Sequence, residues 1–206
     1  MAKTKVNIAF FIKNGIMKGM KYHDYIWDLG GTLLDNYETS TAAFVETLAE
    51  FGIEQEQDSV YEALKVSTAF AIEKYAPGIE SFLEKYKENE ARELEHPVLF
   101  DGIPTLLENI SDQGGRNFLV SHRNDQVLEI LAKTEIAPYF TEVVTASSGF
   151  KRKPDPESMI YLRDKYHITS GLVIGDRAID VEAGHAAGLD AYLFEDVVSL
   201  KQAIDM

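Results

Sequence analysis

A gap of 93 residues separates the ends of the first two strands that the sequence predicts, and it limits the possible folds more than any other feature. The first strand covers 22–28 and ends at Asp28, and the next convincing strand covers 118–121 and ends at Ser121. Two parallel strands and the helix that connects them need only about 30 residues. Some sixty residues are therefore inserted after the first strand.

The inserted segment has a helical pattern. Its apolar residues recur at helical spacing, as at Phe44 and Leu48, and it contains no convincing strand. His96-Pro97 then marks a boundary, because a proline disfavours the continuation of a helix. We therefore predict an all-helical cap over residues 37–100.

Strands and helices alternate in the rest of the chain, residues 20–36 and 101–206. Short connections in such an alternation are typical of parallel strands with crossover helices. The predicted fold class is therefore α/β, a doubly wound parallel sheet with the helical cap inserted after its first strand. We expect further strands over 143–145, 171–175 and 191–194, and helices over 102–112, 125–133, 156–166 and 179–187.

Composition narrows the range of functions. The chain has no cysteine, which excludes disulfides, zinc sites built on thiolates and cysteine nucleophiles, and which fits a reducing, cytoplasmic location. Its 34 acidic and 20 basic residues give a net charge of −14. This charge argues against binding to nucleic acid or to an anionic membrane. If the substrate is an anion, the site must be locally basic.

The first nineteen residues are expected to contribute nothing to function. Their apolar run, Val6–Ile12, follows two lysines as in a signal peptide, but it is only seven residues long and no cleavage site follows it. It is also far too short to span a bilayer. We interpret residues 1–19 as an upstream extension, with Met17 or Met20 as an alternative start.

Polar residues follow the predicted strands at one end of the sheet. Asp28 ends the first strand, Ser121 ends the second, and Asp176 follows the fourth, with Asp180 four residues later. Lys153 lies in the loop after the third strand. In open parallel sheets, ligands bind beyond the carboxyl ends of the strands. These side chains are therefore expected to face one crevice, although each could also be an ordinary turn, cap or loop residue.

The chemistry of this set suits a phosphoryl group. Asp28 and Asp176 can hold Mg²⁺ through their oxygens, and an aspartate can attack phosphorus to form an aspartyl-phosphate. Ser121 at a helix start suits phosphate oxygens, and Lys153 adds a positive charge. Asp180 is expected to orient Lys153 or a water. The local positive field would come from Arg123, Lys151, Arg152 and Arg177.

Four motifs in this order resemble those of the haloacid dehalogenase superfamily of hydrolases. They cover nearly all of residues 20–206, and the place of the cap is similar to that in phosphoglycolate phosphatases and β-phosphoglucomutase. The motifs are Asp28-Leu29-Gly30-Gly31-Thr32-Leu33, Ser121, Lys153-Pro154-Asp155-Pro156, and Gly175-Asp176-Arg177-Ala178-Ile179-Asp180 followed by Ala183-Gly184-His185-Ala186-Ala187-Gly188.

The resemblance implies a role for each matching position. The catalytic residues would be Asp28, Ser121, Lys153 and Asp180. The substrate would be bound by Gly31, Thr32, Ser121, His122 and Lys153. Mg²⁺ would be held by Asp28, Asp176 and the backbone carbonyl of Gly30.

The chain departs from the family at Gly30, where the aspartate that serves as general acid and base would stand. General acid–base catalysis is worth about 10²–10⁴ in rate. A phosphatase could still work on a good leaving group or with another proton source, for which His122 is a candidate. The alternatives are a phosphonatase or dehalogenase type of hydrolase, with Lys65 as the cap lysine, and a binding or regulatory protein. The fourth motif, Gly175–Asp180, has the form that is found in the phosphatases of the family and not the form of the dehalogenases.

The sequence thus predicts a Mg²⁺-dependent phosphatase with a small phosphorylated metabolite as substrate. It does not identify that metabolite, because the cap sets the choice of substrate and no motif lies within it. It also leaves open whether the protein is a monomer or a homodimer.

Overall fold

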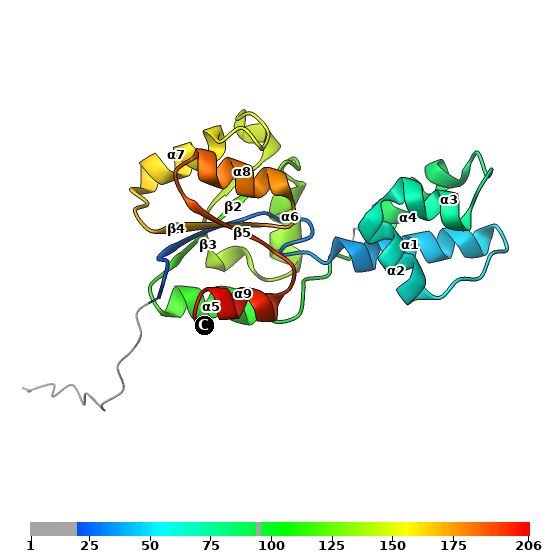
Figure 1. Ribbon diagram of the computed structural model, residues 1–206, viewed down its shortest axis with the longest axis horizontal. Coiled ribbons are helices and arrows are strands. Elements are labelled where there is room, and N and C mark those ends of the chain that lie inside the picture. Colours follow the sequence, from blue (N-terminus) through cyan, green and yellow to red (C-terminus); the bar gives the residue numbers. More distant parts are fainter. Residues whose placement is uncertain (1–19, 94–95) are drawn as a thin grey trace, which may run out of the picture.

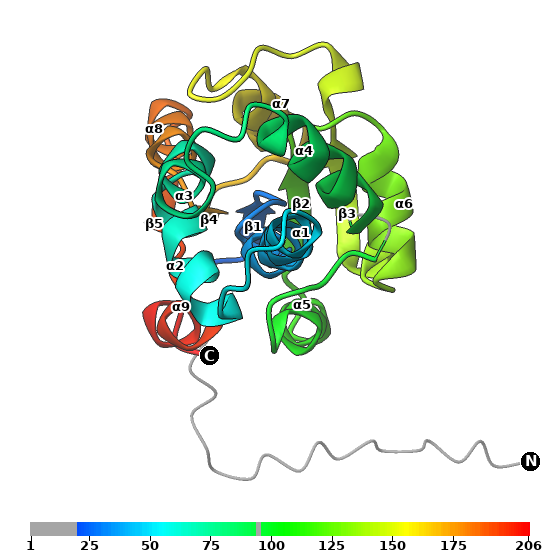
Figure 2. The same cartoon turned by 90° about the vertical axis from the view of Figure 1, so that its right-hand side faces the viewer.

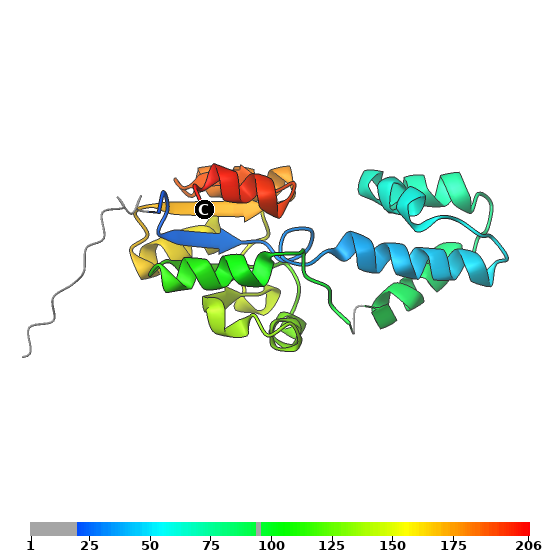
Figure 3. The same ribbon diagram turned by 90° about the horizontal axis from the view of Figure 1, so that it is seen from below.

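The computed structural model describes residues 20–93 and 96–206, so the predicted extension over 1–19 lies outside the described residues. Figure 1 shows two units, a sheet covered by helices and a smaller helical cap. Figure 3 shows the arrows of β1 (Asp24–Trp27) and β4 (Gly171–Gly175) pointing toward the cap. The cap therefore stands beyond the carboxyl ends of the strands, and Figure 2 looks onto it from that side.

The sheet has the predicted doubly wound parallel form. It contains β1, β4, β2 (Arg116–Val120), β3 (Phe140–Val144) and β5 (Asp190–Leu193) in the order β3-β2-β1-β4-β5, and every pairing is parallel. In this register Trp27 lies beside Leu119 and Ile174. The central strand therefore ends level with its two neighbours, which brings the residues after Trp27 close to those that follow β2 and β4.

Alternation along β1 assigns the helices to the two faces of the sheet. Tyr25 and Trp27 share a core with α5 (Ile103–Asp112), α6 (Gln126–Lys133) and α9 (Val197–Ala203). Ile26 points to the other face, where α7 (Glu157–Tyr166) and α8 (Ala178–Ala186) pack. Both faces are thus covered, as Figure 1 shows, and this explains why β1 and β4 at the centre of the sheet are buried along their whole length.

Helix α9 was not predicted from the sequence. Its signals are present: Val197, Leu200 and Ile204 are spaced on one helical face and are buried. The side chain of Asp196 accepts a hydrogen bond from the Ser199 backbone N–H at 2.8 Å, which caps the helix. None of the described helices is long and apolar enough to cross a membrane.

The cap consists of α1 (Asn36–Glu50), α2 (Gln57–Val66), α3 (Thr68–Tyr75) and α4 (Phe82–Glu93). Phe44 fills its core, with ring centroids 4.9 Å from Phe82 and 5.2 Å from Tyr86. An antiparallel bridge between Leu34 and Leu99 joins the two connections to the sheet at the base of the cap. The chain thus leaves and re-enters the core at one point, directly beyond β1.

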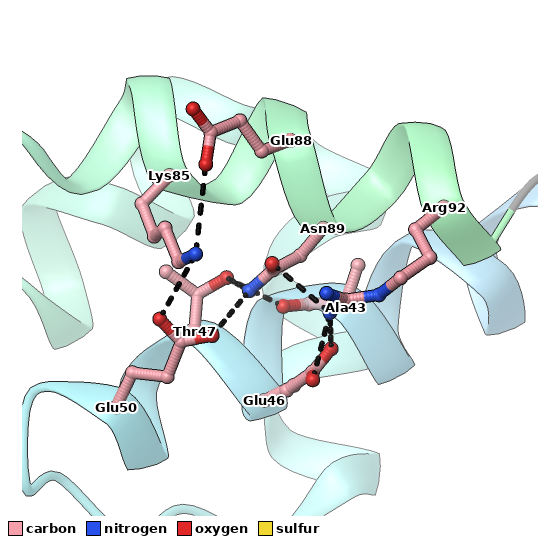
Figure 4. Close-up of polar contacts among 8 residues, drawn as sticks. All are labelled: Ala43, Glu46, Thr47, Glu50, Lys85, Glu88, Asn89 and Arg92. Carbon is pink, nitrogen blue, oxygen red and sulfur yellow. Dashed lines mark hydrogen bonds and ion pairs between the residues drawn. The ribbon is translucent and has the colours of Figure 1, made fainter.

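A buried asparagine joins the two long helices of the cap (Figure 4). Asn89 on α4 is fully buried and donates to Thr47 and Glu50 on α1, at 3.0 Å each. Beside it, Arg92 donates to both oxygens of Glu46 at 2.8 and 2.7 Å. Since an unpaired buried polar group is costly, these contacts fix how α4 lies on α1.

We expect Asn89→Ala to lower the free energy of unfolding by about 1–3 kcal/mol, because it removes three hydrogen bonds, to Thr47, to Glu50 and from Arg92, and leaves a buried gap. Chemical denaturation followed by circular dichroism measures this change. Glu84→Ala, at an exposed site on the same helix, is the control and should stay within about 0.5 kcal/mol of the native protein. Equal stability of the two variants would contradict the role of Asn89.

Candidate active site

A cavity of about 320 Å³ opens at the carboxyl ends of β1, β2 and β4. Asp28 follows β1, Ser121 follows β2 and Asp176 follows β4, and all three line the cavity, so the strands bring them together as the sequence analysis expected. The remaining lining residues are Gly30, Gly31, Tyr37, Ser40, His122, Arg123, Arg152 and Arg177.

Lys153 lies beneath this cavity and joins three loops. Its ammonium is buried, forms ion pairs with Asp28 Oδ1 and, at 2.5 Å, with Asp180 Oδ1, and donates to the Val120 carbonyl at 3.2 Å. The contacts with Asp28 and Val120 are hydrogen bonds, and the contact with Asp180 is an ion pair. Lys153 therefore fixes Asp28 in one orientation.

Asp180 is a helix cap as well as a partner of Lys153. Its Oδ2 accepts the backbone N–H of Arg177 at 3.2 Å at the start of α8. Gly175 makes this close packing possible, since a Cβ there would lie 2.3 Å from the Cβ of Asp180. Both interpretations of Asp180, as a cap and as a group that orients Lys153, thus fit the same contacts.

The carboxylates of Asp28 and Asp176 both line the cavity, and the pKa of each is raised. Burial raises the pKa of Asp28, against the opposing effect of Lys153. Burial, together with the charges of Asp28 and Asp180, raises the pKa of Asp176 to about 6. One oxygen of Asp176, Oδ1, is buried and has no hydrogen-bond partner within the described residues. This oxygen is therefore available to a cationic ligand.

A small, hard cation fits this place. It would be held by Asp28, Asp176 and the Gly30 carbonyl, which are the oxygen ligands that Mg²⁺ prefers. Nowhere in the described part of the chain are three or more His, Cys, Asp or Glu side chains grouped as metal ligands. Two carboxylates and a carbonyl leave the other positions to water, as is common for Mg²⁺.

Gly31 leaves the room that Asp176 occupies. Its φ is +78°, and a Cβ built on it would lie 2.2 Å from Asp176 Oδ2. Such a contact is impossible without movement, so the second glycine of the pair is required by the position of the carboxylate.

His122 is held as a neutral ring. Its Nε2 accepts the backbone N–H of Lys153 at 2.7 Å, which places the ring proton on Nδ1. Burial and the charges of Lys153, Arg152 and Arg177 lower the pKa of His122 to about 4. This arrangement speaks against His122 as the substitute proton carrier. It leaves the ring as a donor on the wall of the cavity.

The structure separates some predicted residues from the cavity and adds others. Thr32 is fully buried and is not among the described residues that line the cavity. Lys65 lines a neighbouring cavity of about 440 Å³, which shares Gly31, Tyr37 and Asp176 with the first. Tyr37 and Ser40 of α1 were missed, although their place directly after the first motif, at the start of the helix that leaves the core, was a usable signal.

The family model for haloacid dehalogenase-like hydrolases matches residues 25–194, which include every candidate residue described above. This chain belongs to that family. The hydrolase is 28% identical over 172 residues to the phosphoglycolate phosphatase of Aquifex aeolicus, covering 79% of this chain and 80% of the relative. Over 183 residues it is also 28% identical to the N-acetylmuramic acid 6-phosphate phosphatase of Pseudomonas putida, covering 82% and 81%.

A solved structure is more similar. The crystal structure of a hydrolase from Streptococcus pneumoniae TIGR4 is 78% identical, with a TM-score of 0.87, and the match covers 91% of this chain and all of that one. The family and the phosphatases among its relatives identify the chain as a phosphatase-type hydrolase.

We expect Gly31→Ala to displace the Asp176 carboxylate and to lower phosphatase activity about a hundredfold. Steady-state kinetics with p-nitrophenyl phosphate measure the loss. Gly114→Ala is the matched control, because Gly114 also has a positive φ of +83° but has nothing within 4 Å of its Cβ position. If both variants lose activity equally, backbone strain rather than contact with Asp176 is responsible.

Asp176→Asn should stabilise the metal-free protein at pH 8 while removing its activity. Because the folded-state pKa of Asp176, about 6, lies above its ordinary value of 3.8, its charge destabilises the fold above that pH. The free energy of unfolding of the native protein should therefore rise as the pH falls through 6. Its difference from that of Asp176→Asn should then be smaller at pH 5 than at pH 8.

Urea denaturation in EDTA at pH 8 and pH 5 measures this difference. Asp164→Asn at an exposed site is the control. A lower stability of Asp176→Asn at pH 8 would show that the carboxylate is stabilising.

Proposed function

We propose that this hydrolase is a Mg²⁺-dependent phosphatase that transfers the phosphoryl group of a small phosphorylated metabolite to Asp28. One observation carries the proposal: the Asp28 carboxylate at the end of the central strand lines a cavity together with three arginines and is paired with a buried lysine. A nucleophilic aspartate needs this combination of a fixed orientation and an anion-binding wall.

Three arginines give the cavity a local positive charge, although the net charge of the chain is negative. Arg123, Arg152 and Arg177 line the cavity, although the whole chain has a charge of −14. Guanidinium groups keep their charge at every relevant pH and match phosphate oxygens with two parallel donors. A phosphate dianion is therefore attracted at this place and repelled by most of the surface.

The cation would be held by Asp28, Asp176 and the Gly30 carbonyl. When bound, it supplies positive charge beside the phosphoryl group. The support for it is the unpartnered oxygen of Asp176 and the raised pKa of both carboxyls.

The residues around Asp28 orient it and bind the phosphoryl group. Lys153 holds Asp28 Oδ1, which directs the other carboxylate oxygen as the nucleophile, and Asp180 holds Lys153. Ser121, whose Oγ accepts the Arg123 backbone N–H at 3.2 Å, offers its hydroxyl proton to a phosphate oxygen. His122 donates through Nδ1. The reaction follows as attack by Asp28 on phosphorus and later attack by water on the aspartyl-phosphate.

We also propose where the protein acts and how large its substrate is. The absence of cysteine supports a cytoplasmic site of action. A cavity that lies between core and cap, with Tyr37 and Ser40 of the cap in its wall, supports a metabolite small enough to be enclosed.

We expect Asp28→Asn to abolish hydrolysis of p-nitrophenyl phosphate, with a loss of at least about a thousandfold, because an amide oxygen is a poor nucleophile. Its circular dichroism spectrum and melting temperature should stay near those of the native protein. Asp112→Asn, at an exposed site on α5, is the matched control and should keep full activity. EDTA should abolish hydrolysis by the native protein, and added Mg²⁺ should restore this activity. Normal turnover by Asp28→Asn would exclude Asp28 as the nucleophile.

A further inference from the structure

Gly30 lines the cavity beside Asp28 without a side chain that could donate a proton. Unlike Gly31, it does not have a left-handed backbone, so the backbone does not require glycine here. The loss of an acid at this place therefore concerns the chemistry and not the fold.

The other titratable groups near Asp28 are already engaged. Lys153 forms ion pairs with Asp28 and Asp180 and donates to the Val120 carbonyl. Asp180 uses Oδ1 on Lys153 and Oδ2 on the Arg177 backbone N–H. The acceptor nitrogen of His122 is occupied by the Lys153 backbone. None of these groups can take up or deliver a proton without breaking the contacts that hold Asp28.

The other residues that line the cavity do not supply a proton donor or acceptor either. The three arginines keep their protons at all relevant pH values. Tyr37 is a phenol whose pKa is raised by burial and by the charge of Asp176, so it holds its proton firmly. The Ser40 hydroxyl donates to Glu90 at 2.8 Å, within the cap. Asp176 also lines the cavity, and in the proposed function its carboxylate is committed to the cation. Among the described residues, the cavity thus has groups that suit a phosphoryl group but no general acid or base that is free for proton transfer.

We infer that this site is selective for activated phosphates, such as acyl phosphates, and that it accumulates as the Asp28 phosphoenzyme during turnover. The inference rests on the proposed function and names its substrate class. It follows from an acid–base position that is empty in both halves of the reaction.

In the first half, an oxygen of Asp28 forms a bond to phosphorus while the bond from phosphorus to the leaving oxygen breaks. The electron pair leaves with that oxygen, and the protein gives it no proton. A carboxylate or an acidic phenolate can depart in this way as a stable anion. An alkoxide needs a proton, and without general acid catalysis it loses about 10²–10⁴ in rate.

In the second half, a water oxygen attacks phosphorus and the bond between phosphorus and Asp28 breaks, which restores the carboxylate. The proton of the water must pass to solvent, because no side chain is free to accept it. This step should therefore be slow for every substrate. With an activated phosphate the first half is fast, and the phosphoenzyme accumulates.

The test is a comparison of leaving groups in the full chain with Mg²⁺. A series of aryl phosphates of graded phenol acidity, acetyl phosphate and glycerol 3-phosphate gives kcat/KM against leaving-group pKa. We expect a steep decrease, with acetyl phosphate at least about a hundredfold better than the alkyl phosphate. In rapid-quench experiments p-nitrophenyl phosphate should release a burst of nitrophenolate equivalent to the enzyme, followed by slow turnover.

Two variants isolate the empty position. Gly30→Asp should flatten the dependence on leaving-group pKa, raise the rate on the alkyl phosphate at least about tenfold and reduce the burst. Gly30→Asn has the same size but transfers no proton, so it should retain the steep slope and the burst. Melting temperatures of both show whether they fold.

The outcomes separate the inference from the function on which it rests. Equal kcat/KM for acyl and alkyl phosphates in the native protein, or the absence of a burst with every aryl phosphate that is turned over, overturns the inference alone. No Asp28-dependent hydrolysis of any phosphate overturns the proposed function and the inference with it.

Discussion

The contact of one lysine ammonium with two carboxylates is the interaction on which the rest of the site depends. Lys153 and Asp180 are almost completely buried, and the side chain of Asp28 is 17% exposed. Charges removed from water to this extent are tolerated only when they are paired and hydrogen-bonded. Asp28 and Lys153 come from the loops after β1 and β3, and Asp180 comes from the first turn of α8, so their pairing also fixes these segments relative to one another.

Much of this arrangement could be predicted, because it depends on spacing along the chain. The strand ends at Asp28, Ser121 and Asp176 follow from apolar runs and turn residues, and a parallel sheet then brings them to one edge. The length of the insertion predicted the cap. The family was evident from motifs that lie at these same ends.

The rest depends on contacts that a linear pattern does not carry. That His122 accepts from the Lys153 backbone requires two loops 31 residues apart to meet. Tyr37 and Ser40 enter the cavity only because α1 rises directly from the edge of the sheet. Helix α9 did have a pattern, but it is seven residues long, which is too short for periodicity alone to be decisive.

The adjacent residues Gly30 and Gly31 have different roles in the site. Gly31 is needed so that Asp176 can occupy its place, whereas Gly30 lines the cavity without a side chain. In the function that we propose, the site has the groups that bind and orient a phosphoryl group and lacks one that transfers protons. The central claim is that the group which receives the phosphoryl is Asp28.

Chemical trapping of the phosphorylated side chain tests this claim most directly. The protein is mixed with p-nitrophenyl phosphate and Mg²⁺, quenched within the first turnover and treated with borohydride, which reduces an aspartyl-phosphate to homoserine. Peptide mass spectrometry should then find homoserine in place of Asp28 and aspartate at every other aspartate position. A phosphoryl group on Ser121 or His122, or an unmodified Asp28 in protein that is turning over substrate, would contradict the account.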